Sequence, residues 1–274
     1  LDWSWGKIHA VHMEPEGSTY TATKETFITG SPLPVTDAII HPADGAMYFA
    51  IGGRRVQSGV YRVTYVGKES TALVKHKPNV NELARLRHRL EQFHGRQHSD
   101  ALNAAWPHLD HPDRFVRWAA LTAVQHQPLA QWKDRALNEK NHTQRVTALL
   151  GLCKVAAADP ANGKPDALVD KQLAATVYKL LADVKWDKLD HTGKLTLVRA
   201  YQIALVRFGD PNARAVKKII AQLEPQFPAP AFEQNWLLCE TLAHLQATTT
   251  AAKGIRLLQE AATQEEQIEY ARSL

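Results

Sequence analysis

The chain has little cysteine and no long apolar run. Only two cysteines occur among its 274 residues, Cys153 in ALLGLCKVA and Cys239 in NWLLCETLA, and both lie in apolar stripes of helical period. We expect two buried thiols, while a disulfide would require their helices to be adjacent, which the sequence leaves open. No CxxCH motif is present, which excludes c-type haem attachment within this chain. No apolar run reaches the roughly 18 residues that cross a bilayer, so no membrane span is predicted.

Motifs of common catalytic and nucleotide-binding sites are also absent. The chain contains no G-x-S-x-G, no P-loop and no G-x-G-x-x-G, and GGRR at residues 52–55 lacks a third glycine and a following helix. His88, His94 and His98 are close in the sequence, but Gly95 interrupts the helix that would align them as metal ligands. No metal site is therefore predicted.

Acidic and basic residues are nearly balanced, with 33 Lys and Arg against 28 Asp and Glu. Residues 1–74 carry six basic and seven acidic side chains, so the positive excess lies in the rest of the chain. There the basic residues are scattered along predicted helices beside acidic ones, without the basic runs and interleaved aromatic residues of a nucleic-acid groove. Nucleic acid is therefore not a predicted partner.

Residues 1–67 are predicted to form short β-strands. Apolar and polar residues alternate in KIHAVHM, TDAIIHP, AMYFAIG and GVYRVTYVG, with turn-forming residues between them. Asp44 and Gly45 fit such a turn, because aspartate bonds the backbone ahead of it and glycine accepts a positive φ. We expect a single four-stranded sheet. Since a sheet this small leaves its faces uncovered, we expect it to be the end of a larger domain whose beginning is missing.

After a polar linker around Pro78, apolar residues recur with a helical period. Asn141 and Thr263 are each followed three residues later by Gln or Glu, the spacing of a capping box at a helix start. Asp210, followed by proline, is typical of a cap with proline in the first turn. Successive helices with no strand between them indicate either a bundle or a solenoid of helical pairs.

The stretch HLDHPDRFVRWAALTAVQHQP favours the solenoid. Its residue order resembles the second-helix signature of the HEAT repeat family, in which small alanines let the next helix approach, and Arg and Asp satisfy the turn between repeats. The matching residues are Asp110, Pro112, Asp113, Val116, Arg117, Ala119, Ala120 and Ala123. We predict about five helical pairs from Pro78 to the end, each contacting mainly its neighbours.

A more specific resemblance covers essentially the whole chain. It rests on DWSWGKIHAVHM, TDAIIHPADGAMYFAIGGRRVQSGVYRVTYVG, RHRLEQFHG, AWPHLDHPDRFVRWAA, LVRAYQIALVRFG and TQEEQIEYARSL. Together these segments resemble a family of large secreted proteins of planctomycete and verrucomicrobial type. In that family a sorbosone/glucose-dehydrogenase-like β-propeller leads into HEAT repeats and then, often, a C-terminal cytochrome c domain.

The resemblance implies a mainly α fold in two parts. Residues 1–72 would be a partial β-propeller, its final blade, and residues 73–274 a HEAT-repeat-like α-solenoid that stops before any haem domain. It also implies a periplasmic or extracytoplasmic location. The implied partners are the remaining propeller blades and a cytochrome c domain or protein. No cofactor is expected in this chain, while pyrroloquinoline quinone (PQQ) and haem c are implied for the parent protein.

Three residues of the strand part are candidates for a site. Arg54 and Arg55 lie in the glycine-rich GGRRVQSG loop, where a guanidinium could hold an anionic or quinone cofactor. The family pattern has one arginine followed by a small residue, which favours Arg54. For these arginines, and for Asp37 before AIIHP, a structural role in a turn is the favoured alternative. The seven tryptophans are interpreted as packing anchors, because they are spread through the chain. For Trp3 and Trp5, which share a predicted strand face, stacking on a carbohydrate is the less favoured alternative.

Three functions remain open from the sequence. The first is a non-catalytic scaffold and docking portion of a secreted, dehydrogenase-like multidomain protein. The second is that the parent is a quinone-dependent sugar or alcohol dehydrogenase whose active site includes Arg54. The third is a stand-alone HEAT module that binds a peptide or protein.

Overall fold

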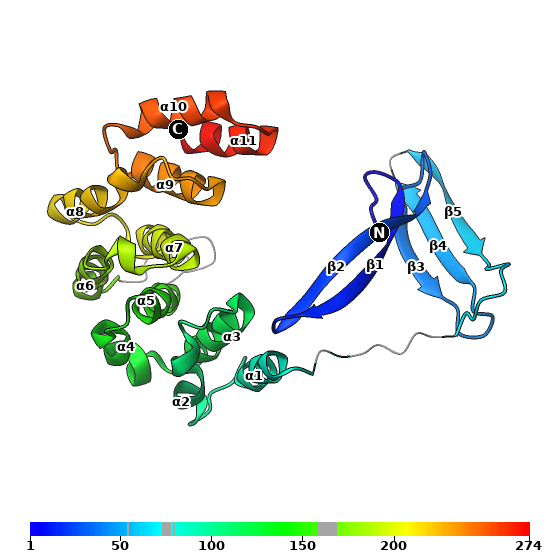
Figure 1. Ribbon diagram of the computed structural model, residues 1–274, viewed down its shortest axis with the longest axis horizontal. Helices are drawn as coiled ribbons and strands as arrows, with labels where there is room; N and C mark the ends of the chain where they lie inside the picture. Colours follow the sequence, from blue (N-terminus) through cyan, green and yellow to red (C-terminus); the bar gives the residue numbers. More distant parts are fainter. Residues whose placement is uncertain (54, 73–77, 79, 158–168) are drawn as a thin grey trace. The chain divides into compact units, whose positions relative to one another are not determined.

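A computed structural model describes residues 1–53, 55–72, 78, 80–157 and 169–274. These residues form two compact units, Leu1–Arg85 and Leu86–Leu274. The boundary lies within helix α1 (Glu82–Glu91), later in the chain than the predicted boundary at residues 72–73. Strands make up the first unit and helices the second, so the described chain is mainly helical (Figure 1).

The strand unit contains two antiparallel sheets, and the prediction of a single four-stranded sheet is wrong. One sheet pairs β1 (Lys7–Glu16) with β2 (Thr19–Thr29), and the other has the order β3 (Val35–Ile40), β4 (Met47–Gly53), β5 (Val56–Val63). Strand β2, with the sequence TYTATKETFIT, carries mostly exposed polar side chains. Threonine is a good strand former, but this segment has too little apolar content for a hydrophobic pattern to reveal it.

Turn chemistry fixes the connection between β3 and β4 as the sequence predicts. The Asp44 carboxylate accepts a hydrogen bond from the backbone amide of Ala46 at 3.0 Å, and Gly45 has a φ of +66°. The same carboxylate accepts from the hydroxyl of Tyr48 at 2.9 Å and from the guanidinium of Arg62 at 3.1 Å. This turn therefore also ties β4 to β5.

The three-stranded sheet is apolar on both faces. Residues paired across neighbouring strands point to the same face of the sheet. The pairings of β3 and β5 with β4 therefore show which residues lie on each face. One face carries Ala38, Ile40, Met47, Phe49, Ile51, Tyr61 and Val63, and the other Asp37, Ile39, Tyr48, Ala50, Val60 and Arg62. A sheet with this pattern is expected to have both faces covered.

Within the strand unit these faces are poorly covered. The buried cluster is small and consists of Ile8, Val35, Phe49 and Ile51. Ile40 is 57% exposed on the face that includes Phe49, and Ile39 and Val60 are 62% and 75% exposed on the opposite face. The strand unit thus leaves much of the apolar surface of this sheet in solvent.

The helical unit is built from helices that contact one another in consecutive pairs. After α1 the pairs are α2 (Ala101–Ala105) with α3 (Arg114–Gln125), α4 (Leu129–Asn138) with α5 (His142–Ala156), α6 (Lys171–Ala182) with α7 (His191–Phe208), α8 (Ala213–Leu223) with α9 (Phe232–His244), and α10 (Thr250–Glu260) with α11 (Gln264–Ser273). The described residues thus form five pairs, the number that the sequence predicts. Three short 3₁₀ segments, Trp106–His108, Trp186–Lys188 and Glu224–Gln226, lie between them.

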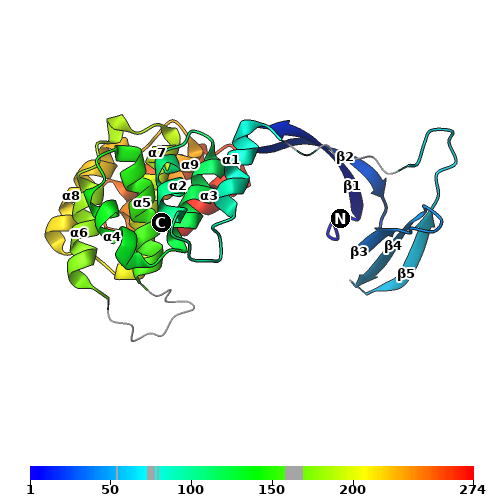
Figure 2. The same cartoon turned by 90° about the horizontal axis from the view of Figure 1, so that it is seen from below.

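Two layers of helices result from this pairing. Helix α3 contacts α5, α5 contacts α7, α7 contacts α9 and α9 contacts α11, whereas α4 contacts α6 and α6 contacts α8. Figures 1 and 2 both show α4, α6 and α8 on one side of the helical unit and α7 and α9 on the other. We call α3, α5, α7, α9 and α11 the odd-numbered layer.

Helix starts follow the predicted caps in two of three cases. The Asn141 side chain caps α5, and the Thr263 hydroxyl accepts from the amide of Glu266 at the start of α11. The prediction of a cap at Asp210 is wrong, because Asn212 caps α8 by accepting from the amide of Ala215 at 3.0 Å. Asp210 instead lies 2.8 Å from the imidazole of His244.

One hydrogen bond recurs at the start of three helices of the odd-numbered layer. In each case, the side chain of the residue four positions after the N-cap donates to the backbone carbonyl of the residue two positions before the N-cap. The three bonds are Arg117 to His111, Arg145 to Glu139 at 2.8 Å and Asn235 to Ala229 at 2.8 Å. The pairs are thus built on a common local geometry.

A single hydrophobic cluster extends from Leu90 to Tyr270 through the helical unit. Cys153 in α5 and Cys239 in α9 belong to it as free, buried thiols, which confirms the prediction of two buried cysteines. Burial raises the pKa of the Cys153 thiol to about 12 and that of Cys239 to about 11. Both side chains are therefore neutral packing residues at physiological pH.

Candidate functional site

The candidate site is a cavity of about 470 Å³ on the odd-numbered layer, bounded by α3, α5 and α7. Helix α3 contributes the residues with the largest side chains, and α5 and α7 contribute smaller ones. The lining residues are Arg114, Phe115, Arg117, Trp118, Leu121, Thr147, Leu150, Thr192 and Thr196. Most of this surface is apolar, with cationic groups from α3 at its margin.

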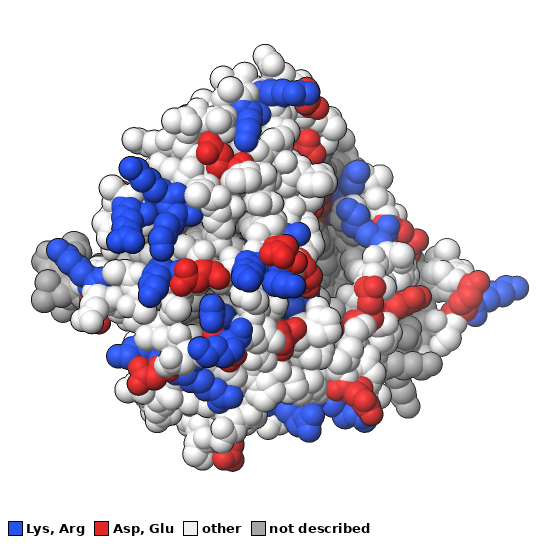
Figure 3. Space-filling view, turned by 60° about the vertical axis from the view of Figure 1, so that its left-hand side comes forward, with Lys and Arg blue, Asp and Glu red and all other residues white. Residues whose placement is uncertain are grey.

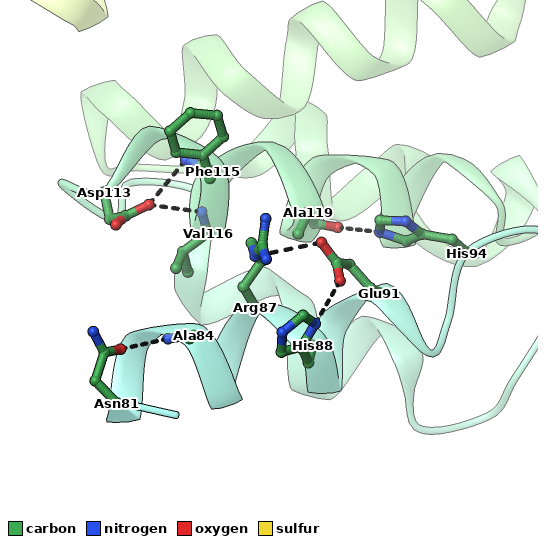
Figure 4. A network of polar contacts seen from close by, with 10 residues as sticks. All are labelled: Asn81, Ala84, Arg87, His88, Glu91, His94, Asp113, Phe115, Val116 and Ala119. Carbon is green, nitrogen blue, oxygen red and sulfur yellow. Dashed lines mark hydrogen bonds and ion pairs between the residues drawn. The ribbon is translucent and has the colours of Figure 1, made fainter. Parts of the chain in front are cut away.

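Hydrogen bonds from outside the helix surround α3, as Figure 4 shows. The Asp113 carboxylate accepts from the amides of Phe115 and Val116 at 2.9 and 3.1 Å. On the other side of the helix, His94 bonds the carbonyl of Ala119 at 2.9 Å. These contacts fix α3, and therefore fix the direction in which its aromatic residues project.

Arg117 is buried at the base of the cavity. Its guanidinium donates to the carbonyl of His111, and burial lowers the pKa of the guanidinium even though the charges of Asp190 and Asp113 act in the opposite direction. Because its charge already faces these carboxylates, Arg117 is better suited to fix the fold at this point than to bind a ligand.

A glycine allows α5 to approach α3 closely below the cavity. A Cβ atom at Gly151 would lie 2.7 Å from Cδ1 of Leu121, closer than real contacts allow. Glycine costs helix stability, by roughly 1 kcal/mol relative to alanine, so its presence in α5 is explained by this packing. Lys154, three residues after Gly151 on α5, lies beside Trp118 of α3.

Two cations stack on the exposed aromatic rings of α3. The Nζ atom of Lys154 lies 4.8 Å from the centre of the Trp118 ring, and Cζ of Arg114 lies 4.8 Å from that of Phe115. Trp118 is nevertheless 55% exposed. Cation–π contacts of this kind contribute about 0.5–1 kcal/mol at exposed positions.

Positive charge accumulates beside Trp118. Burial lowers the pKa of the Lys154 ammonium, and the nearby guanidinium groups of Arg199 and Arg207 lower it further. Arg199 donates to the side chain of Gln202 at 3.0 Å. The three cations repel one another, so an anion bound among them would be stabilised.

A second cavity continues the site along α7. It has a volume of about 340 Å³ and lies between α7 and α9, lined by residues that include Arg199, Ile203, Val206 and Glu240. On α7, the first cavity is lined by Thr192 and Thr196, and the second by Arg199, Ile203 and Val206. This spacing of three and four residues places them on one helix face, so both cavities lie along the same face of α7. We call this face of α3, α5, α7 and α9, with its two cavities, the groove.

The structure places the sequence-predicted residues elsewhere. Arg54 lies outside the described residues, so its role remains a prediction. Arg55 directly precedes β5 and has a φ of +59°. Gly52 and Gly53 belong to β4 and residues 56–59 to β5, although the sequence predicts all of them in the loop. Asp37 lies on the apolar sheet face beside Ile39 and Val60, and its carboxylate accepts from the neighbouring amide of Ala38.

The surroundings of Asp37 give no support to a quinone site there. The shallow cavity of about 180 Å³ at Asp37 is lined mainly by apolar side chains, and Asp37 itself would repel an anionic quinone. Among the residues that the structure describes, no group of three or more His, Cys, Asp or Glu could hold a metal ion. In the same residues, no helix is both long and apolar enough to cross a membrane.

Sequence reasoning missed the groove because it interpreted Trp118 as a packing anchor. That interpretation holds for Trp106 and Trp132, which are buried, but Trp118 and Trp5 are exposed. The available signal was the spacing in RFVRWAAL, where the apolar stripe is formed by Val116, Ala119, Ala120 and Ala123, and Trp118 falls outside it. Lys154 and Arg199 gave no signal, because their proximity depends on the packing of α5 against α7.

The side of the helical unit formed by α6 and α8 differs from the groove in its mixed charge. Figure 3 looks at the side on which Figure 1 places α6 and α8, and basic and acidic side chains are interspersed over much of it. A cavity of about 330 Å³ between α6 and α8 is lined by Lys179, Arg214 and Lys218. It contains no exposed aromatic residue comparable to Trp118 among its described lining residues.

Comparisons with protein-family models, with curated proteins and with solved structures find no match to this chain.

Proposed function

We propose that this chain is the non-catalytic scaffold and docking portion of a secreted, dehydrogenase-like multidomain protein. In this proposal, residues 1–72 are the final blade of a β-propeller and residues 73–274 are a HEAT-like α-solenoid. The helical array connects the propeller with a cytochrome c domain or protein, outside the cytoplasm. PQQ and haem c belong to other parts of the parent protein.

The observation that carries the proposal is the three-stranded sheet with apolar residues on both faces. Val60 and Ile39 are exposed on one face and Ile40 on the other. Exposed apolar patches of this kind mark surfaces that are covered by a partner. A propeller blade meets this description, because neighbouring blades cover both of its faces.

The pairing of the helices supports the solenoid. Each pair contacts the preceding and following pairs within the odd-numbered layer, and a common hydrogen bond recurs at the starts of α3, α5 and α9. Successive pairs are also linked by polar bonds, since Asp110 accepts from the side chains of Asn141 and Gln144 at 2.8 and 3.1 Å. Such nearest-neighbour contacts are typical of repeat arrays.

A docking role agrees with the separate core of the helices. Their hydrophobic cluster lies entirely within the helical unit and includes no residue of a strand. The groove on the odd-numbered layer supplies a surface for a partner. The quinone-dependent alternative rests on Arg54, for which the described residues supply no supporting contact.

The intact mass of the native protein tests this proposal. A mass well above 30.6 kDa is expected, because the additional blades and an electron-accepting domain would be part of the same chain. A native mass near 30.6 kDa would contradict it and would favour the stand-alone binding module.

A further inference from the structure

The groove over α3, α5, α7 and α9 combines three features that together define the chemistry of its occupant. It has two largely apolar cavities along the same face of α7, the exposed rings of Trp118 and Phe115 beside the first, and the cations Arg114, Lys154 and Arg199 at the cavities or beside Trp118. Neighbouring helices pack about 10 Å apart, so four helices span roughly 30–40 Å. This is the length of an extended segment of about ten to twelve residues.

The cations along the groove favour an acidic occupant. None of the described residues that line the first cavity is acidic, and the cations Arg114, Lys154 and Arg199 lie along its margin and continuation. Lys154 is half-buried and lies near two guanidinium groups. Carboxylates placed there would form charge-assisted hydrogen bonds and relieve the repulsion among these cations.

The apolar part of the groove requires an anchor side chain. The first cavity is lined by Leu121, Leu150 and the ring of Trp118. Tryptophan is a residue type that often dominates binding energy at interfaces. An aromatic or large aliphatic side chain would fill it and stack on the free part of the indole ring. The threonines of α7 on the opposite wall could bond the backbone of the bound segment.

A peptide fits this surface better than a nucleic acid does. A single strand of nucleic acid carries a phosphate at every nucleotide and is bound along an uninterrupted basic track. Here Glu240 lies in the second cavity, where it accepts a hydrogen bond from Gln202 at 2.9 Å. A phosphate chain running along the groove would meet this carboxylate, whereas a peptide can place an uncharged or basic residue beside it.

We propose that this groove binds an acidic peptide segment of a partner protein, with an apolar anchor in the cavity beside Trp118 and carboxylates against Lys154 and Arg199. The inference deepens the proposed docking function and rests on it. It assigns the docking surface to the odd-numbered layer and gives the partner a recognisable sequence character.

The test begins with selection from a library of random peptides of about twelve residues on the full 274-residue chain. Acidic sequences with an aromatic or aliphatic anchor should be enriched. Binding of an enriched, fluorescently labelled peptide is then measured on the wild type and on variants. Trp118→Ala and Lys154→Glu should each weaken binding by about tenfold or more, and added salt should weaken it further.

Controls separate this result from unfolding and from nonspecific charge effects. Lys217 is exposed on α8, away from the groove. The variant Lys217→Glu makes the same charge change there and should alter affinity by less than about twofold. Because Trp118 is exposed, Trp118→Ala should keep the thermal midpoint and helical circular dichroism of the wild type.

Three outcomes would overturn the inference. These are enrichment of basic or uncharged peptides, equal binding by the wild type and the Trp118 and Lys154 variants, and tighter binding of a single-stranded oligonucleotide than of any peptide. None of them bears on the intact mass of the native protein, which tests the scaffold proposal separately.

Discussion

The side chain of Asn235 bonds both backbone groups of Ala229. Its Nδ2 donates to the Ala229 carbonyl at 2.8 Å, and its Oδ1 accepts from the Ala229 amide at 2.6 Å. Ala229 lies in the segment that leads into α9, and Asn235 is buried one turn into that helix. A single amide therefore takes the place that arginine has at the starts of α3 and α5.

Replacing Asn235 with alanine should destabilise the helical unit by about 1–3 kcal/mol, since it leaves a donor and an acceptor of the backbone without partners. Urea unfolding monitored by circular dichroism measures the change. The matched control is Asn138→Ala, which removes an exposed amide that bonds the carbonyl of Asp134 within α4. The control should stay within about 0.5 kcal/mol of the wild type. Equal losses of unfolding free energy for the two substitutions would show that the Asn235–Ala229 hydrogen bonds do not stabilise the helical unit more than an exposed amide contact.

Glu139 gives the helical unit a stability that depends on pH. Burial alone would raise the pKa of its carboxyl, but hydrogen bonds from the indole of Trp106 and from the amides of Asn141 and Lys140 outweigh it and bring the pKa below the usual 4.5. Because the folded-state pKa is the lower one, this stabilisation is complete above about pH 4.5 and is lost as the pH falls through the folded-state value.

The variant Glu139→Gln isolates that contribution, because glutamine keeps the shape and an acceptor oxygen but cannot ionise. Thermal midpoints of the two proteins, measured from about pH 6 to about pH 3, should differ most at the upper end and converge at the lower end. A difference that is constant over the whole range would show that ionisation of Glu139 does not contribute.

The exposed sheet face should tolerate polar substitution in this chain. The double variant Ile39→Thr, Val60→Thr should leave the unfolding midpoint of the strand unit nearly unchanged and should reduce binding of a hydrophobic dye, because both side chains are in solvent. Phe49→Ala is the opposing control, since Phe49 is buried in the small cluster and its loss should cost about 3 kcal/mol or more. A large loss of stability in the double variant would mean that these residues are packed within the chain.

Local signals in the sequence were sufficient for much of the fold. The Asp44–Gly45 turn and the caps at Asn141 and Thr263 depend on contacts within three residues, so the sequence predicts them correctly. The cap at Asp210 fails because Asn212, two residues later, offers an equally good capping side chain, and only the packing of α8 decides between them. Strand β2 was missed because its polar residues hide the strand period.

The candidate groove could not be derived in the same way. It depends on contacts between α3, α5 and α7, whose residues are up to some eighty positions apart in the chain. Lys154 of α5 lies beside Trp118 of α3 because these two helices pack against each other. The sequence identified Arg117 and Asp113 through the HEAT-like pattern, and these residues hold α3 in place at the edge of the groove.

The central claim is that the helices form a self-sufficient unit, whereas the three-stranded sheet requires partners that cover its faces. Native-state hydrogen exchange on the full chain, followed by mass spectrometry of peptides, tests it most directly. Amides of α5 and α7 should be strongly protected, and amides of β3, β4 and β5 should exchange faster by roughly a hundredfold or more, because local opening of a poorly covered sheet costs little free energy. Protection of the sheet equal to that of the helices would contradict the account.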